Sequence, residues 1–270
     1  MVDTAFPRCT LGGVHIDLVE SSQSALDEVI ARVQTPEQPP LAVASVNLDH
    51  VHHFGSKPGL FSGEELSWLF LLDGAPVVRR VRQVTKRPWP CIAGSDLLEP
   101  LLERCVNSNV SVGFLGGSEQ THHALRKVLI ERMPDLRISG MWAPGREELV
   151  DPLRSAALAK QIQATKTDVL LVCLGKPLQE VWMAQHGIAT GARAMLAFGA
   201  AIDFLAGNAK RAPRIFRRAG AEWAWRFIHE PARLSRRYLV QGPRALAALY
   251  TWSSPPRELP SNLNRLEERG

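Results

Sequence analysis

The stretch Asp168-Val-Leu-Leu-Val-Cys-Leu-Gly-Lys-Pro-Leu-Gln-Glu180 indicates the fold of this chain more clearly than any other segment. Its first half is a short, continuous apolar run, which is typical of a strand buried on both faces. A glycine then ends the run, and polar side chains follow. In parallel sheets that are covered by helices, ligands bind outside the carboxyl ends of such strands.

Apolar strand-like runs alternate with helical patterns along most of the chain. We expect strands at 14–19, 41–47, 110–115, 136–141 and 194–199 and helices at 24–33, 121–132 and 149–164. A further helix is expected at 64–70, running into an apolar strand that ends at residue 72. This alternation predicts an α/β fold with a largely parallel sheet and helices on both faces.

The composition is that of a globular protein with a sizeable core: 270 residues, 45% hydrophobic and 22% charged. The four cysteines form no C-x-x-C pair, which favours a reduced cytoplasmic setting over a disulfide framework. The N-terminus lacks the layout of a signal peptide, and no apolar stretch approaches the ~20 residues that span a bilayer. We expect a cytoplasmic protein that can rest on a membrane surface.

The C-terminal third carries a dense group of basic residues. They are Lys210, Arg211, Arg214, Arg217, Arg218, Arg226, Arg233, Arg236, Arg237 and Arg244, against only Glu222 and Glu230. Guanidinium groups suit phosphate, because their planar fork donates two parallel hydrogen bonds. Interleaved aromatic residues favour packed helices over a disordered tail; the alternative is a solvated basic helix pair. We therefore expect a core at 1–206, a basic helical appendage at 207–252 and a flexible tail at 253–270.

Polar residues follow two of the expected strands. Ser45 and Asn47 alternate at a strand end and so share one face, where they position a substrate hydroxyl or simply end the strand. Asp73 follows the next strand, where a carboxylate with a raised pKa would suit a general base. The alternative for Asp73 is an Asx turn, which is common for Asp-Gly pairs.

Two strand ends carry glycines and suit phosphate or sugar. Gly116 and Gly117 precede an expected helix, so the corner is either a nucleotide site or a tight structural turn. After Gly175, Lys176 could meet a phosphate and Gln179 a sugar or base edge, whereas Glu180 could instead serve the helix start.

Histidines also gather in two places, at His50, His52 and His53 and at His122 and His123. We expect no metal at either, because the needed partner ligands are absent nearby and adjacent histidines point in different directions.

In their linear order, these pieces resemble the WecG/TagA/CpsF glycosyltransferases (glycosyltransferase family 26) over roughly residues 10 to 245. The matching motifs are Ser45-Val-Asn47, Asp73-Gly74-x-Pro-Val-Val78, Gly94-x-Asp96-Leu97, Phe114-Leu-Gly-Gly117 with Pro134-x-Leu136, Gly175-Lys-Pro-Leu-Gln179-Glu180, Asp203-Phe-x-Ala-Gly207, Arg211-Ala-Pro213, Glu222-Trp223-x-x-Arg226, and Glu230-Pro-x-Arg233 with Arg237-Tyr238. Ser45 stands where the family has threonine. Alanines replace glycines before Asp203, which leaves the donor sugar open.

The resemblance implies a Rossmann-like core and an inverting transfer of a sugar, often of the N-acetylmannosamine type, from a UDP-sugar. The implied acceptor is a polyprenyl-diphosphate-linked sugar at the cytoplasmic face of the cell membrane, and no metal or other cofactor is implied. Asp73 is then the expected base, while Arg211 and Arg226 stabilise the departing diphosphate. The expected substrate-binding residues are Ser45, Asn47, Gly116, Gly117, Gly175, Gln179, Glu180, Arg233 and Arg237.

Two other classes of function compete with this interpretation. A nicotinamide-dependent oxidoreductase would use the same kind of sheet, but the chain has no G-x-G-x-x-G. A nucleic-acid-binding protein would use the basic C-terminus and show steep salt dependence. We expect contact with anionic lipids instead of nucleic acid, and a homo-oligomer is compatible with a closing appendage.

Overall fold

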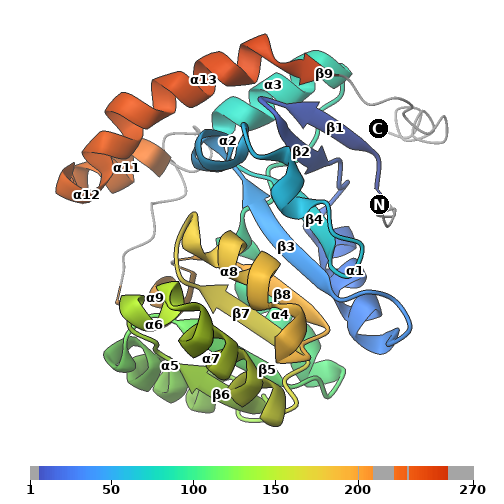
Figure 1. Ribbon diagram of the computed structural model, residues 1–270, viewed down its shortest axis with the longest axis vertical. Coiled ribbons are helices and arrows are strands. Elements are labelled where there is room, and N and C mark those ends of the chain that lie inside the picture. The colour runs from blue at the N-terminus through green and yellow to red at the C-terminus, as the bar shows by residue number, and fades with distance from the viewer. Residues whose placement is uncertain (1–5, 200, 209–221, 230, 255–270) are drawn as a thin grey trace.

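A six-stranded parallel sheet forms the centre of the protein (Figure 1). The structure is a computed structural model that describes residues 6–199, 201–208, 222–229 and 231–254. The strand order is β4 (Ser67–Leu72), β3 (Leu41–Val46), β8 (Ala194–Ala197), β7 (Val169–Cys173), β5 (Val112–Gly116) and β6 (Ile138–Trp142), and all neighbours are parallel. The expected α/β fold with a Rossmann-like sheet is confirmed.

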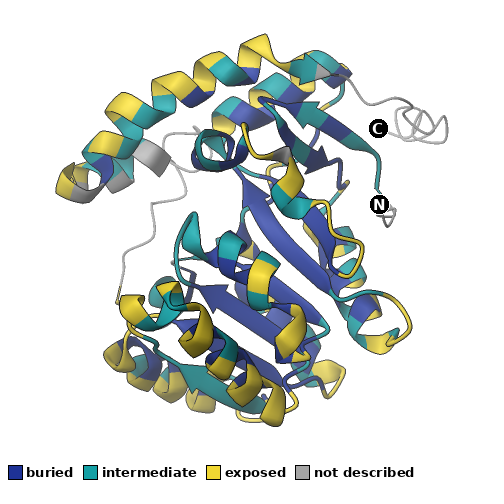
Figure 2. Cartoon of the chain, in the orientation of Figure 1, coloured by how far each residue is buried: buried dark blue, intermediate teal, exposed yellow. Residues whose placement is uncertain are grey.

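Helices cover both faces of this sheet, because successive strand side chains point to opposite sides. Ala42, Ala44 and Val46 of β3 pack on the face covered by α2 (Leu48–Phe54), α3 (Ala75–Thr85), α7 (Pro152–Ala164) and α8 (Leu178–His186). Leu41 and Val43 pack on the opposite face, under α1 (Ser22–Gln34), α4 (Gly94–Asn107), α5 (Glu119–Arg132) and α9 (Ala201–Leu205). Figure 2 shows the sheet, buried except for the half-buried edge strand β6, between helices whose outer sides are exposed.

The strand expected at 14–19 lies outside the central sheet. It forms β2 (Val14–Asp17), which pairs antiparallel with β1 (Arg8–Leu11) through a turn in which Gly12 and Gly13 have φ of 58° and 78°. Such positive φ values favour glycine at both positions of a two-residue hairpin. The side chain of Asp17 accepts a hydrogen bond of 2.7 Å from the backbone N–H of Phe70, so the hairpin covers the edge strand β4.

Two expected helices differ from the observed elements. The helix expected at 64–70 is wrong, because residues 67–72 form β4 and pair in register with β3. Both faces of β4 are buried, which requires a continuous apolar run that short-range periodicity does not distinguish from a helix. The helix expected at 149–164 is divided into α6 (Arg146–Val150) and α7, since the carboxylate of Asp151 caps the start of α7.

Helices follow residue 221, as expected for the basic appendage. They are α11 (Glu222–His229), α12 (Pro231–Ser235), a π-helical segment (Arg236–Gln241) and α13 (Gly242–Thr251), and Figure 1 shows them across one end of the core. Ala245 and Leu249 of α13 join the core cluster that includes Val51 of α2. The short strand β9 (Ser253–Ser254) pairs with β1. The residues beyond, 255–270, lie outside the described part, and the three-part division stays a prediction.

Two 3₁₀ segments complete the described elements. They lie at Pro58–Phe61, between α2 and β4, and at Ile188–Thr190, between α8 and β8.

Candidate functional site

The carboxyl ends of the parallel strands lie along one edge of the sheet. The site residues that the sequence predicts within residues 1–206 lie at or after these strand ends. β3 lies between β4 and β8, while β7 lies between β8 and β5. The chain leaves β7 toward β8 on one side and leaves the neighbouring strand β5 toward β6 on the other. Ligands of open α/β sheets bind at positions where neighbouring connections diverge in this way.

Asn47 and Asp73 are in direct contact at this edge. The Asn47 Nδ2 donates a hydrogen bond of 3.2 Å to Asp73 Oδ2, and the backbone N–H of Asp73 donates to the carbonyl of Val46 at 3.1 Å. Gly74 has φ of 79°, and a Cβ there would lie 3.2 Å from the Asn47 Cβ. Glycine therefore permits this turn, and the Asn47 amide orients the half-buried carboxylate.

Asn47 also begins a helix. Its Oδ1 accepts a hydrogen bond of 3.3 Å from the backbone N–H of His50, so Asn47 is the N-cap of α2. This cap fixes the side-chain amide in one orientation, with its oxygen toward the helix and its nitrogen toward Asp73. The second oxygen of Asp73, Oδ1, lies 3.8 Å from the Cys91 Sγ, which donates to it.

The loop after β7 is held by its own side chains. Gly175 has φ of 76°, and its N–H donates to Gln179 Oε1 at 3.2 Å. The Gln179 Nε2 donates to the carbonyl of Ala197 at 3.1 Å and to Glu180 Oε1 at 3.2 Å. The Gln179 amide thus joins the ends of β7 and β8, while contact of Gln179 or Glu180 with a sugar stays a prediction.

Lys176 lies within the same cluster and makes contacts that its sequence position does not reveal. Its Nζ donates to the carbonyl of Ser45 at 2.9 Å and to Glu180 Oε1 at 2.5 Å. Ser45 is buried at the end of β3. The phosphate contact predicted for Lys176 is untested, and two of the three ammonium donors point into the protein.

The corner after β5 requires its glycines for close packing. Gly116 has φ of 101°, and a Cβ there would lie 2.4 Å from the carbonyl oxygen of Cys173; Gly117 has φ of 80°. Ser118 caps α5, and the Thr121 hydroxyl donates to Asp203 Oδ1 at 3.1 Å. The tight structural turn is therefore real, and nucleotide binding at the start of α5 stays a prediction.

The arginines of the appendage are only partly described. Arg211 lies outside the described residues, and Arg226 and Arg233 lie on α11 and α12 with side chains that are also outside them. The guanidinium of Arg237 pairs with Asp49 Oδ2 of α2 at 3.3 Å. Asp49 Oδ1 also lies 3.6 Å from His53 Nε2. Arg237 therefore ties the appendage to the helix that Asn47 begins.

His50 lies next to Glu180 in the candidate site, a position that its sequence context, which suggested at most a metal ligand, does not reveal. Its buried Nδ1 lies 4.0 Å from Glu180 Oε1. Burial lowers the pKa of His50 well below its ordinary value, and the Lys176 ammonium and His53 lower it further. The signal in the sequence was the apolar residue four positions on, Phe54, whose ring lies 4.7 Å from the His50 ring.

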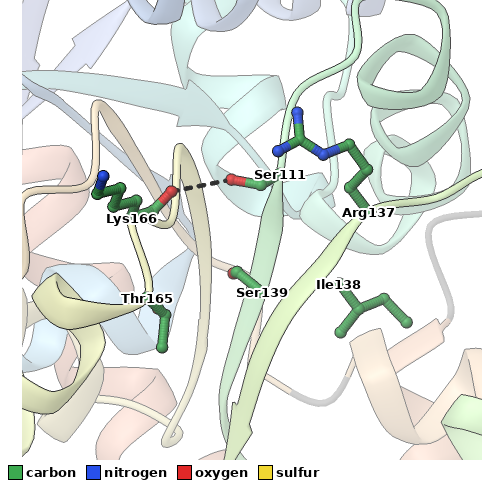
Figure 3. A pocket seen from close by; sticks show the side chains of 6 residues that line it. All are labelled: Ser111, Arg137, Ile138, Ser139, Thr165 and Lys166. Carbon is green, nitrogen blue, oxygen red and sulfur yellow. Dashed lines mark hydrogen bonds between the residues drawn. The ribbon is translucent and has the colours of Figure 1, made fainter.

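The described residues contain no group of three or more His, Cys, Asp or Glu side chains placed to hold a metal ion. A separate hollow of about 250 Å³ is lined by Ser111, Arg137, Ile138, Ser139, Thr165 and Lys166 (Figure 3). These residues begin or precede β5, β6 and β7, so the hollow lies at the amino ends of the strands, opposite the predicted site. It is therefore not the place where the sequence predicts catalysis.

Large apolar side chains are exposed on the described appendage. They include Ile228, Leu239, Val240, Leu246, Tyr250 and Trp252. On α13, Leu246 and Tyr250 are exposed whereas Ala245 and Leu249 face the core. None of the helices in the described ranges has the length and apolar character needed to cross a membrane. The appendage thus presents apolar residues next to the exposed Arg236 and Arg244.

The model of one protein family matches almost the whole chain. It is the model of the glycosyl transferase WecG/TagA/CpsF family, and the match covers residues 9–258 of 270. The match spans every described element that contributes to the Asn47–Asp73 edge, together with the described helices of the appendage.

Proposed function

We propose that this chain, which belongs to the WecG/TagA/CpsF glycosyltransferase family, transfers a hexose from a UDP-sugar to a polyprenyl-diphosphate-linked sugar. Family membership itself makes the protein a glycosyltransferase of cell-surface polysaccharide synthesis. The donor nucleotide, the sugar, which we expect to be of the N-acetylmannosamine type or a related hexose, and the lipid-linked acceptor are our proposal. The observation that carries it is the contact between Asn47 and Asp73 at the carboxyl edge of the sheet.

In the proposed reaction, Asp73 is the general base. Its carboxylate accepts the proton of the acceptor hydroxyl while that oxygen attacks the anomeric carbon of the donor. The bond between the anomeric carbon and the diphosphate oxygen breaks on the opposite face, so UDP leaves and the configuration inverts. The Asn47 amide supports this role, because it holds one carboxylate oxygen and leaves the orientation of the group fixed.

Negative charge develops on the departing diphosphate, and cationic donors must stabilise it. We assign this role to Arg211 and Arg226, with Arg233 binding the substrate, because guanidinium groups match phosphate oxygens. Loss of one such donor typically costs about 3 kcal/mol of transition-state stabilisation, which is about 100-fold in rate. Arg237 contributes by tying the appendage to α2 through Asp49.

The acceptor lipid places the reaction at the inner face of the cell membrane, where we propose that the appendage docks peripherally. The exposed Leu246, Tyr250 and Trp252 supply apolar contact with the headgroup region. Exposed arginines near an anionic leaflet contribute about 1 kcal/mol each to the free energy of membrane binding.

Flotation with phosphatidylglycerol vesicles tests this surface. Leu246→Asp should weaken flotation, while Leu153→Asp, a substitution of an exposed leucine on α7, should not. Equal flotation of both variants would exclude the docking surface.

Release of UDP tests the proposed reaction. The full chain is incubated with each member of a panel of UDP-sugars, with and without polyprenyl-diphosphate-GlcNAc, in lipid vesicles. Acceptor-dependent release from one donor supports the proposal and identifies the sugar. If UDP neither binds nor is released, the proposed donor chemistry is wrong.

Asp73→Asn tests the base. We expect turnover to fall at least about 100-fold while the affinity for UDP changes little, because only the proton acceptor is lost. Asp135→Asn, an exposed carboxylate in a loop, is the matched control and should leave turnover unchanged. Retained turnover in Asp73→Asn would remove Asp73 from its role.

A further inference from the structure

A buried ion pair lies behind the proposed site. The side chain of Lys176 is 10% exposed and that of Glu180 is 0% exposed, and their charged atoms are 2.5 Å apart. Taking two charges out of water is costly, so a buried pair of this kind adds little or nothing to stability compared with apolar residues. The contacts that the pair makes with its surroundings indicate what else it does.

Lys176 holds the end of β3 at the point where its pairing with β8 stops, while the pairing with β4 continues to Val46. β3 pairs with β8 only as far as Ala44, which lies opposite Ala197. The carbonyl of the next residue, Ser45, accepts instead from the Lys176 ammonium at 2.9 Å. Lys176 therefore takes the place of the missing β8 partner at Ser45, two residues before Asn47.

Glu180 fixes Lys176 in turn. Its Oε1 accepts from Lys176 and from Gln179, and the Gln179 amide also binds the ends of β7 and β8. His50 Nδ1 lies 4.0 Å away, beyond hydrogen-bond distance, so Lys176 is the cation that pairs with Glu180. These contacts join the carboxyl ends of three strands through one buried carboxylate.

We propose that Lys176 and Glu180 are positioning residues, which hold the carboxyl end of β3 against the β7 loop and so keep Asn47 in contact with Asp73. This positioning role rests on the proposed function in one respect, namely that Asp73 is the general base. It differs from the sequence-based expectation, in which Glu180 binds substrate and Lys176 a phosphate. The side chains act from behind the reacting edge, through the Ser45 carbonyl and the Asn47 amide.

Three variants separate positioning from stability. Lys176→Met and Glu180→Gln each leave one buried charge unpaired, and the double variant K176M/E180Q leaves none. The matched control is R32M/E28Q on α1, because Arg32 and Glu28 form another largely buried pair with the same spacing. Arg32 also holds a carbonyl next to β3, that of Pro39, but at the opposite end of the strand.

The Cys91 thiol reports the position of Asp73 without any turnover. The chain has four cysteines; Cys91 is exposed, whereas Cys9, Cys105 and Cys173 are buried with raised pKa values. Only Cys91 should therefore react quickly with a thiol reagent such as DTNB in the folded protein. The carboxylate beside it disfavours the thiolate, so the reaction should accelerate when Asp73 moves away. Asp73→Asn sets the upper limit of that acceleration.

We expect both single variants to lower the melting temperature and the double variant to recover most of it. In the double variant, kcat should stay about 10-fold or more below that of the wild type, because small misplacements of reacting groups are expensive. The KM for the donor should change less than about twofold, and Cys91 should react at a rate close to that of Asp73→Asn.

Recovery of kcat and of the Cys91 rate together with the melting temperature would overturn the inference, as would equal effects in R32M/E28Q. If the wild type shows no acceptor-dependent release of UDP, the proposed function fails by that result alone. The Cys91 rates of the same variants then still decide whether the pair positions Asp73.

Discussion

Replacing His50 by leucine is expected to flatten the pH dependence of folding stability below neutral pH. The His50 ring is fully buried among Phe54, Phe61 and Phe70, with ring centroids 4.7, 5.8 and 5.8 Å away. Burial lowers the pKa of His50 well below its ordinary value, with smaller contributions from Lys176 and His53. The folded protein therefore keeps the ring neutral under conditions in which the unfolded chain binds a proton.

The sign and size follow from proton linkage. The pKa of His50 is lower in the folded protein than the value of about 6.5 in the unfolded chain. The contribution of the neutral ring to the free energy of unfolding is therefore fully present above about pH 6.5 and is lost as the pH falls below it. One excluded proton gives a limiting slope of about 1.4 kcal/mol per pH unit. Between pH 7.5 and 5.5, His50 should account for a loss of about 1.4 kcal/mol in the free energy of unfolding.

Urea unfolding at pH 5.5, 6.5 and 7.5 measures this difference. Burial is also the largest cause that lowers the pKa values of His15, His53 and His186, but these groups remain in the variant and cancel in the comparison. Phe54→Leu is the matched control, because it disturbs the same cluster without removing a titrating group. The reasoning is refuted if His50→Leu loses as much stability between pH 7.5 and 5.5 as the wild type does.

Three further changes test the packing that supports the site, each measured by urea unfolding. Gly116→Ala should lower the free energy of unfolding by at least about 3 kcal/mol, because the alanine would have a strained φ and its Cβ would clash with the backbone. Gly59→Ala has open space around the new Cβ and should lower it by less than about 1 kcal/mol. Equal losses in the two variants would contradict the packing argument. Asp17→Ala removes the buried carboxylate that binds the Arg8 guanidinium in β1 and the Phe70 N–H in β4. It should lower the free energy of unfolding by about 3–5 kcal/mol. A loss under about 1 kcal/mol would show that the hairpin does not need this contact. Arg237→Met leaves the buried Asp49 carboxylate without its partner in the appendage. It should lower the free energy of unfolding by about 1–3 kcal/mol. An unchanged value would mean that the pair does not hold the appendage.

Much of the site could be predicted from local sequence, because chemistry and position coincide at the ends of parallel strands. Asn47, Asp73 and Gly175 each come directly after a buried apolar run, and such ends share one edge of a sheet. Their order along the chain also carried the resemblance to the family that the match over residues 9–258 confirms. The error at 64–70 had a local cause, since two glutamates precede a run that is short enough for either a strand or a helix turn.

The sequence by itself determined which segments are buried and which polar residues end them, because a strand covered on both faces needs an unbroken apolar run. Only the tertiary structure decided which of those residues touch. Asn47 and Asp73 are 26 positions apart, and Lys176 lies 131 positions from the Ser45 carbonyl that it binds. These contacts depend on the strand order, which places β3 between β4 and β8 and brings the β7 loop close to its end. Strand order is set by packing of the whole sheet against its helices, and no local pattern in the chain encodes it.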